Sequence, residues 1–374
     1  MRTTRRGFLG AAAVPQAEGL SHGAELDGFS IARRHRIVRG LPTPSFFEGM
    51  LLGNGDVGVC VTVRPDALGL HLGKEDSWDI RVSEDHYQHV LHFRELLKLW
   101  ERASAEAKRQ GQPEMLHLET SIDFFREYTG KVRSSYAKAW PRPWPCGVVW
   151  AHWDARMVRL VRQVLDPSNG VLRVTLEHDD LKGKRRQFTL ECLVNQVTGH
   201  VVVASAGWAP VLSVAYYPNI DREAGLPAPE LEAKDGEFSC YQHFPAVAPT
   251  AEQPNPPRTE RDRNFALCGR LSGKWTAELS PVRVFFKSGG EQEFRLDVTL
   301  TTPRDARDNV RQARMEAAGL AAIPMKRLQA ESELWWRGFW GKSEGRSRRL
   351  MRRKQSGLNW RVRRPVRSTA GATV

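Results

Sequence analysis

The segment GMLLGNGDVGVCVTV, residues 49–63, decides the fold of this chain. Its central part, Gly53 to Gly58, satisfies the GxGxxG pattern of dinucleotide-binding loops. In those loops a helix begins directly after the glycines, and its N-terminus holds the pyrophosphate. Here the residues that follow are Val59-Cys60-Val61-Thr62-Val63, which are strand formers. We therefore predict that the glycines form a tight loop entering a β-strand, and that no nicotinamide or flavin binds there.

Short strands separated by hairpin-length spacers continue to residue 301. In each of them apolar residues alternate with period two or occupy both faces. The predicted strands are Val57–Val63, Leu68–Leu72, Val171–Leu176, Phe188–Leu193, His200–Ser205, Val211–Tyr217, Asn264–Leu271, Lys274–Leu279, Val282–Lys287 and Phe294–Thr301. Turn signals such as Pro167-Ser168-Asn169-Gly170 separate them. The pattern predicts a mainly β fold, a large antiparallel β-sandwich.

Helical composition marks two insertions and the region after the last strand. Tyr87–Gln110 and Ser121–Lys138 are predicted to be helices inserted over a sheet face. Asp305–Ala318 and Met325–Trp340, rich in Ala, Arg, Glu and Met, are predicted to form a helical linker. The second of these helices ends in the aromatic run Trp335–Trp340, which must bury against another part of the protein.

The charge of the chain is concentrated at its two ends. The 374 residues are 41% hydrophobic and 26% charged, typical of a globular protein, and carry a formal net charge of +13. Residues 341–374 contribute a net +10 and residues 1–40 a net +4, which leaves −1 for residues 41–340. Because the body is nearly neutral, its charge does not indicate a nucleic-acid partner. No run of about 18 apolar residues occurs, so no membrane span is predicted.

The N-terminus has the features of a twin-arginine export signal. Thr4-Arg5-Arg6-Gly7-Phe8-Leu9-Gly10 combines a basic start with a weakly apolar stretch that ends at Val14, before Pro15-Gln16-Ala17. Residues 1–17 are therefore predicted to direct export to the periplasm of a bacterial cell. The alternative is a disordered basic start.

Cysteine and histidine spacing favours no metal centre. The five cysteines are Cys60, Cys146, Cys192, Cys240 and Cys268. They contain no CxxC pair, and most are predicted to be small buried apolar residues. On a helix, His86, His89 and His92 would spread over about 120°, too wide to share one metal ion. Neither a metal nor a cofactor is predicted.

Two motifs resemble a known family of enzymes. Gly49–Gly58 and the turn Leu70-His71-Leu72-Gly73-Lys74-Glu75-Asp76-Ser77-Trp78-Asp79 are similar to the start of the N-terminal β-sandwich of family 95 glycoside hydrolases, the α-L-fucosidase and galactosidase group, and of related bacterial proteins. The resemblance covers roughly residues 30–340. It implies a supersandwich domain, a helical linker and then an (α/α)6 barrel that carries most of the catalytic residues.

The resemblance also suggests a division of the chain. Residues 30–302 would form the β-sandwich domain and residues 303–340 the helical linker. Residues 341–374, crowded with arginine, depart from the family pattern where the barrel should start. We interpret them as a disordered or frame-shifted tail of a truncated gene product. The alternative is a genuine basic tail that binds nucleic acid or an acidic surface.

Acidic residues gather in both motifs, and they are Glu48, Asp56, Glu75, Asp76 and Asp79. Glycosidases use two carboxyl groups, about 5–5.5 Å apart when retaining and roughly 6.5–9.5 Å apart when inverting. The acids here could supply such a pair, or they could cap turns and order a loop that borders a substrate cleft. The candidate substrate-binding residues are Asn54, Asp56, Lys74, Asp76, Trp78, Asp79 and Trp144, and no catalytic residue is assigned.

Four tryptophans lie close together in residues 140–153, within a proline-rich segment. They could form a platform on which sugar rings stack, or they could pack the loop onto the sheet. The two interpretations differ in whether the rings are open to solvent.

The leading functional interpretation is the N-terminal carbohydrate-active domain of a glycoside hydrolase-like protein, without its catalytic barrel. One alternative is a stand-alone carbohydrate-binding or scaffold protein with a basic tail. Another is an enzyme whose acid pair lies within Glu48–Asp79. Carbohydrate is the expected partner, with no nucleic acid and no membrane span, and the oligomeric state is left open.

Overall fold

The computed structural model describes residues 27–81, 83, 91–109, 111, 129–130, 139–180, 182–221, 225–244, 263–290 and 292–355, with the helix beyond residue 342 described by its backbone. The predicted export signal, the second predicted insertion helix apart from residues 129–130, and the last part of the basic tail lie outside these residues. Within the described part of the chain, no helix is long and apolar enough to cross a membrane.

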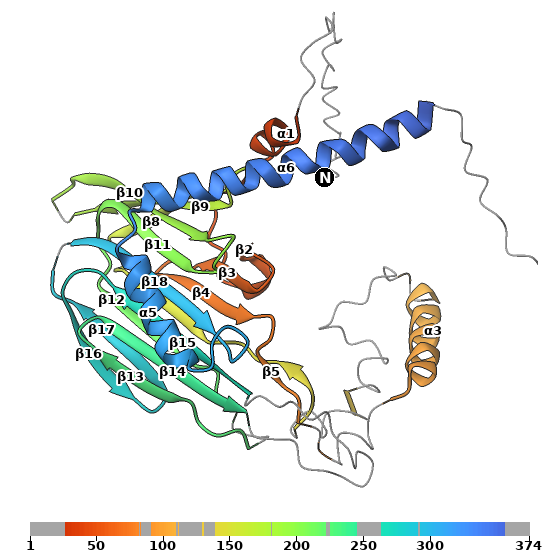
Figure 1. Ribbon diagram of the computed structural model, residues 1–374, viewed down its shortest axis with the longest axis horizontal. Helices are drawn as coiled ribbons and strands as arrows, with labels where there is room; N and C mark the ends of the chain where they lie inside the picture. Colours follow the sequence, from red (N-terminus) through yellow and green to blue (C-terminus); the bar gives the residue numbers. More distant parts are fainter. Residues whose placement is uncertain are drawn as a thin grey trace, which may run out of the picture.

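Two large antiparallel sheets form the body of the protein (Figure 1). In spatial order, the first has nine strands: β1 (Ile37–Arg39), β8 (Val158–Asp166), β9 (Val171–Asp179), β10 (Arg185–Val194), β11 (Val201–Ala209), β18 (Gln292–Thr301), β15 (Arg263–Leu271), β14 (Glu237–Phe244) and β13 (Glu230–Lys234). The second has seven: β16 (Trp275–Ser280), β17 (Arg283–Ser288), β12 (Ser213–Tyr217), β7 (Val148–His152), β4 (Ala67–Lys74), β3 (Val57–Val63) and β2 (Met50–Gly53). The predicted mainly β fold, a large antiparallel β-sandwich, is confirmed.

The GxGxxG segment forms the turn of the β2–β3 hairpin, as the strand-forming residues after it predict. Gly53 pairs with Gly58 across the hairpin, and Gly55 adopts a φ of 94°, which favours glycine. No helix follows the glycines, because the chain continues directly into β3. The amide groups that would bind a pyrophosphate at a helix N-terminus are therefore lacking at this turn.

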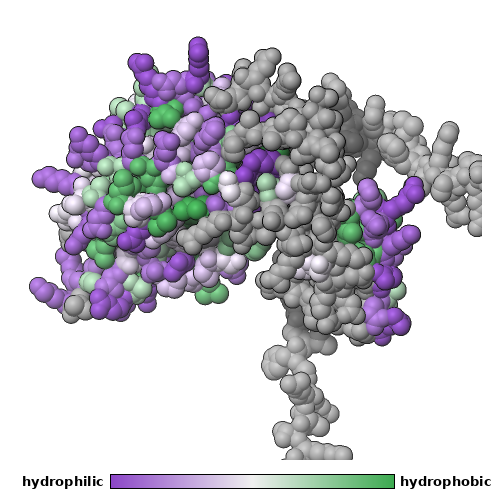
Figure 2. Space-filling model, turned by 90° about the horizontal axis from the view of Figure 1, so that it is seen from below, coloured by the Kyte–Doolittle hydropathy of each residue, from purple (hydrophilic) through white to green (hydrophobic). Residues whose placement is uncertain are grey.

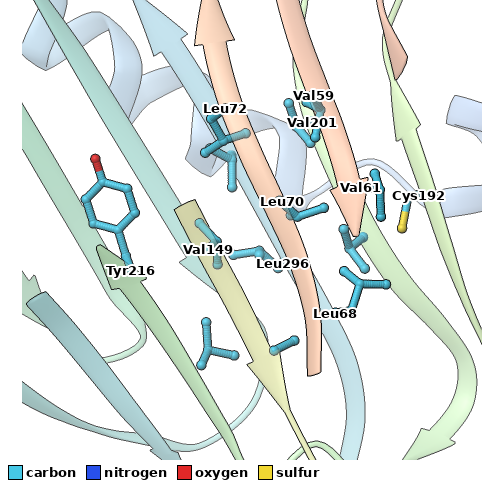
Figure 3. Close-up of a cluster of buried hydrophobic side chains, with 14 of the residues drawn as sticks. Val59, Val61, Leu68, Leu70, Leu72, Val149, Cys192, Val201, Tyr216 and Leu296 are labelled. Atoms are coloured by element: carbon cyan, nitrogen blue, oxygen red, sulfur yellow. The ribbon is translucent and has the colours of Figure 1, made fainter. Parts of the chain in front are cut away.

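Period-two alternation in β3 and β4 builds the core between the two sheets. Val59 and Val61 of β3 and Leu68, Leu70 and Leu72 of β4 are buried and point toward the other sheet (Figure 3). They meet residues of the nine-stranded sheet, among which Figure 3 labels Cys192, Val201 and Leu296. Each such side chain contributes about 1.5–3 kcal/mol by leaving water. All five cysteines are buried and free, as most were predicted to be.

Two helices cover the outer face of the nine-stranded sheet. α5 (Asn309–Ala321) packs through Ala313 and Ala317 on Ala266 and Cys268 of β15, so small side chains bring the helix close to the sheet. α6 (Met325–Gln355) begins over the same sheet. Its Leu328, together with Leu320 of α5, packs on outward-facing residues of β9, β10 and β11. Where these helices cover the sheet, outward-facing positions of the strands are apolar as well, as Val171, Leu193 and Val202 show.

The two helices α5 and α6 are observed where a helical linker was predicted, but the second helix is longer than predicted. α6 continues beyond Trp340 to Gln355, past the boundary placed at residue 340, and Figure 1 shows it extending beyond the edge of the sandwich. The first predicted insertion helix is observed as α3 (Phe93–Arg109), but its predicted place over a sheet face is wrong, because α3 lies to one side of the sandwich. Two short elements, α1 (Gly28–Arg34) and the 3-10 helix η1 (Phe46–Glu48), precede the hairpin.

Half of the aromatic run on α6 packs on the turn between β8 and β9. Trp340 donates its Nε1–H to the carbonyl of Pro167 at 2.9 Å, and Ser332 donates to the carbonyl of Asn169 at 2.6 Å. Trp336 packs directly over Gly170, where no side chain would fit. Leu334, Trp335 and Phe339 stay exposed.

The outer surface mixes apolar and polar groups. Seen from below, hydrophobic atoms form separate patches among hydrophilic ones (Figure 2). Such a surface is ordinary, because roughly 55–60% of the accessible surface of folded proteins is apolar. An exposed aromatic ring therefore indicates a site only where polar groups are fixed beside it.

We predict that Gly170→Ala destabilises the protein more than the matched variant Gly183→Ala. Both glycines have positive φ, 65° and 80°, so alanine costs about 1–2 kcal/mol at either position. Only at Gly170 does the new Cβ also collide with Trp336, which adds roughly 1–3 kcal/mol. Urea unfolding measures the difference, and equal losses would contradict the docking of α6 on this turn.

Candidate functional site

The β2–β3 turn places one carboxylate at the start of β3. Asn54 Oδ1 accepts hydrogen bonds from the backbone N–H groups of Asp56 at 3.1 Å and Val57 at 2.8 Å. This arrangement is an Asx-type turn, in which the side chain replaces a backbone acceptor. Asn54 therefore fixes the turn, and the Asp56 carboxylate, 45% exposed, stands at its end.

Lys74 is held in the interior by that carboxylate. It is the last residue of β4 and pairs with Val57, so its side chain starts beside the β2–β3 turn. Its Nζ lies 2.7 and 2.6 Å from the two oxygens of Asp56, and the side chain is 2% exposed. A buried ammonium is stable only when it is paired, and this geometry provides the pairing.

Two more carboxylates complete the group. Lys74 Nζ lies 3.3 Å from Asp305 Oδ2 and 3.7 Å from Asp76 Oδ1. Thr302 donates its hydroxyl to Asp76 Oδ2 at 2.6 Å and its backbone N–H to Asp305 Oδ2 at 2.8 Å. We call Asp56, Lys74, Asp76, Thr302 and Asp305 the Lys74 cluster. It joins the β2–β3 turn and the end of β4 to the segment that precedes α5.

The cluster keeps the ammonium charged. Burial by itself lowers the pKa of Lys74, because the charged form loses its hydration. The hydrogen bond to Asp56 and the charges of Asp76 and Asp305 outweigh burial, so the pKa of Lys74 is raised above its usual value of 10.5. With three carboxylates around one ammonium, the site retains acceptor capacity on its exposed side.

Trp78 lies two residues after Asp76 of this cluster in the sequence. It forms the two-residue strand β5 (Trp78–Asp79), where it pairs with Pro143 of β6 (Arg142–Pro143). Its Nε1–H donates to the carbonyl of Glu75 at 2.7 Å, which fixes the orientation of the indole. The residue is 42% exposed, so part of the ring is open to solvent.

Asp79 is buried in a network of ion pairs that stabilises the fold. Its carboxylate is fully buried and accepts from Arg81 Nε at 3.0 Å and from Arg81 Nη2 at 2.8 Å. Asp221 joins the network through Arg142 Nη2 at 3.0 Å and Arg81 Nη2 at 3.4 Å. These ion pairs hold the strands β5 and β6 in place. Asp79 therefore stabilises the strand that contains Trp78 and does not face solvent.

The tryptophan-rich segment packs inward at two of its four rings. Trp144 is 4% exposed and meets the ring of Phe244 edge to face at 6.2 Å. Trp153 is also buried and donates Nε1–H to the carbonyl of Pro65 at 2.8 Å. Trp144 therefore has no open face for a ligand, and the packed-loop interpretation describes these two residues.

The remaining acids and histidines do not form a metal centre within the described residues, where no group of three or more His, Cys, Asp and Glu side chains could hold an ion. Glu48 accepts from the backbone N–H of Ser45 at 3.3 Å and caps η1. His92 donates its backbone N–H to Glu95 at 3.0 Å. His86 and His89 lie outside the described residues.

Sequence patterns missed Thr302, the last residue of the predicted sandwich domain, and Arg304 and Asp305 at the start of the predicted linker. Arg304 Nε lies 3.8 Å from Asp76 Oδ2, and the other two belong to the Lys74 cluster. These residues are more than 200 positions from the motifs, with a separation of 226 between Asp76 and Thr302. Only the closing of the sandwich brings them together.

Comparisons with known proteins give only low similarity. No family model and no curated protein matches the chain. Among solved structures, a putative kojibiose phosphorylase from human microbiome aligns with a TM-score of 0.41 and 9% sequence identity. The alignment covers 82% of this chain and 38% of that chain, so this chain spans less than half of its length.

We predict that Lys74→Met lowers the free energy of unfolding by about 2–4 kcal/mol. Removing one partner of a buried ion pair costs about 3–5 kcal/mol, and here the partial exposure of Asp56 and Asp305 reduces the loss. Lys182→Met, at an exposed turn position, is the control and should change stability by less than about 0.5 kcal/mol. Equal effects of the two variants in urea unfolding would contradict the pairing.

The contribution of Lys74 should also depend on pH in one direction. Because its folded-state pKa is raised above the unfolded value of 10.5, its stabilisation is complete below pH 10.5 and is lost as the pH rises through the folded-state pKa. We expect the stability difference between wild type and Lys74→Met to be constant near neutral pH and to shrink above pH 10.5. A difference that already falls below that pH would show that Lys74 is not held charged.

Proposed function

We propose that the chain is a carbohydrate-active β-sandwich domain of a glycoside hydrolase-like protein, and that it binds carbohydrate at the turn that carries Trp78. The observation that carries the proposal is a partly open tryptophan ring, fixed by a hydrogen bond and a strand pairing, that follows directly on Lys74 and Asp76 of the Lys74 cluster. We retain export through residues 1–17 as part of this proposal.

The chemistry of sugars matches these groups. One face of a pyranose ring is lined by C–H groups and stacks on an aromatic ring, while its hydroxyl groups need donors and acceptors around the edge. Trp78 supplies the ring, and the partly exposed carboxylates of Asp56 and Asp305 supply acceptors. Because Lys74 already holds both carboxylates, little side-chain entropy is lost on binding.

The residues named from the sequence then divide into two groups. Asp56 and Trp78 would touch the ligand, whereas the Asp76 side chain is only 8% exposed and is held by Thr302 and Lys74. Asn54, Lys74 and Asp79 are positioning residues, because each acts on the turn through the groups that it binds. The two motifs that resemble family 95 glycoside hydrolases contain all of these residues and support the carbohydrate class of ligand.

We predict that Trp78→Ala weakens oligosaccharide binding roughly five- to thirtyfold, an effect of about 1–2 kcal/mol from the lost stacking surface. The ligand is chosen from a glycan array, with fucosyllactose as the first probe, and the affinity is measured by calorimetry. Trp100→Ala is a matched control, since Trp100 is 43% exposed against 42% for Trp78 and lies on α3, apart from the sandwich (Figure 1).

Two results would contradict the proposal. One is the absence of binding to any glycan of the array by the folded full chain. The other is an affinity of Trp78→Ala equal to that of wild type and of Trp100→Ala. Thermal unfolding of each variant separates loss of the ring from loss of the fold.

A further inference from the structure

A large groove opens where the Lys74 cluster meets the start of α5. Its volume is about 1110 Å³, and it runs between the β13–β15 edge of the nine-stranded sheet and residues 303–310. Arg304 and Asp305 line it, and the same two residues contact Asp76 and Lys74. The turn that carries Trp78 therefore connects to the wall of the groove through Asp76.

Hydrogen bonds hold both walls of the groove in place. On the sheet side, Arg314 of α5 is bound to Glu232 and to Ser239, the latter at 3.1 Å. At the base, Asn309 Nδ2 donates to Asn264 Oδ1 at 2.6 Å. A groove with fixed walls loses little conformational entropy when a ligand enters.

The lining has many charged groups and nearly balanced charge. Three guanidinium groups and four carboxylates face the groove, and they belong to Arg304, Arg307, Arg314, Glu230, Glu232, Asp305 and Asp308. Guanidinium groups offer planar pairs of donors, and carboxylates offer pairs of acceptors. A hydroxyl group donates and accepts at once, so adjacent hydroxyls of one molecule satisfy both kinds of group.

We infer that this groove binds a neutral oligosaccharide, several sugar residues long, that extends from the Trp78 turn. The inference rests on the proposed carbohydrate-binding function and specifies its ligand. The volume lies above the range of roughly 300–1,000 Å³ that is typical of sites for single small molecules. A monosaccharide would leave most of the lining unused.

The lining argues against an acidic ligand. The lining has no excess of positive charge to attract a phosphate, a sulfate or a uronic acid. Its carboxylates outnumber its guanidinium groups, and Arg314 is already paired with Glu232. The N-terminus of α5 is not open to an anion either, because Asp308 accepts the backbone N–H of Arg311 at 3.1 Å.

The test uses two lining residues that do not hold the fold together. Within the described part of the chain, Glu230 and Arg307 form no ion pair, so their removal leaves the walls intact. The double variant Glu230→Ala/Arg307→Ala is compared with Glu278→Ala/Arg311→Ala, which removes an exposed acid from the edge strand β16 and an exposed arginine from α5.

Three probes are titrated into the full chain by calorimetry: neutral fucosyllactose, the longer neutral lacto-N-fucopentaose, and trigalacturonic acid. Wild type should bind the pentasaccharide roughly tenfold more tightly than the trisaccharide and should bind the acid most weakly. The groove variant should lose that tenfold gain and keep its affinity for fucosyllactose. The control variant should behave as wild type.

The outcomes separate the two proposals. Equal affinity for both neutral probes, unchanged by the groove variant but reduced by Trp78→Ala, overturns the groove and leaves the Trp78 site standing. Pentasaccharide binding that the groove variant weakens and Trp78→Ala does not overturns the Trp78 site and supports the groove. Tighter binding of trigalacturonic acid would overturn the inference that the ligand is neutral. Failure of every probe to bind would overturn the inference that the groove binds an oligosaccharide.

Discussion

The pairing of the Lys74 ammonium is the constraint on which the rest of the molecule depends. A charge that is 2% exposed must be balanced within a few ångströms, and its partners come from three separate parts of the chain. Asp56 comes from the β2–β3 turn, Asp76 from the turn after β4, and Asp305 from the segment before α5. Pairing of this ammonium with Asp305 therefore fixes the position of the segment that leads into α5. The same segment forms one wall of the groove.

The sandwich supplies the rigidity that this arrangement needs. Its core is apolar and closed between the sheets, while α5 and α6 cover the outer face of the nine-stranded sheet. Polar side chains that could contact a ligand therefore lie at the strand ends and connecting turns, where the chain is exposed to water. Asp79 follows the same principle, because its buried network with Arg81 and Asp221 anchors the short strands that carry Trp78.

Local pattern predicted many of the strands but not all that obey it. Burial alternates along β7 and β14, and neither was predicted. β3 and β4 were predicted because their apolar residues face a dry core. β8 was missed because it carries Arg159 and Arg162 and a bulge between Leu160 and Arg162 that interrupts the alternation. The motifs identified one half of the candidate site, but Thr302, Arg304 and Asp305 reach it only through tertiary folding, which no local pattern encodes. Trp144 looked like a binding residue because composition does not distinguish an open ring from a packed one.

The burial of Lys74 changes what the two sequence motifs mean. A lysine followed by two acids and a tryptophan suggests a row of ligand contacts when the residues are considered in sequence. In the structure the lysine faces inward and organises its neighbours, and only Trp78 and the outer edges of the carboxylates reach solvent. The main role of Lys74 in the motif is thus to fix the positions of the neighbouring carboxylates. The segment before α5 belongs to the same cluster, so the position of the linker and that of the motif depend on one another.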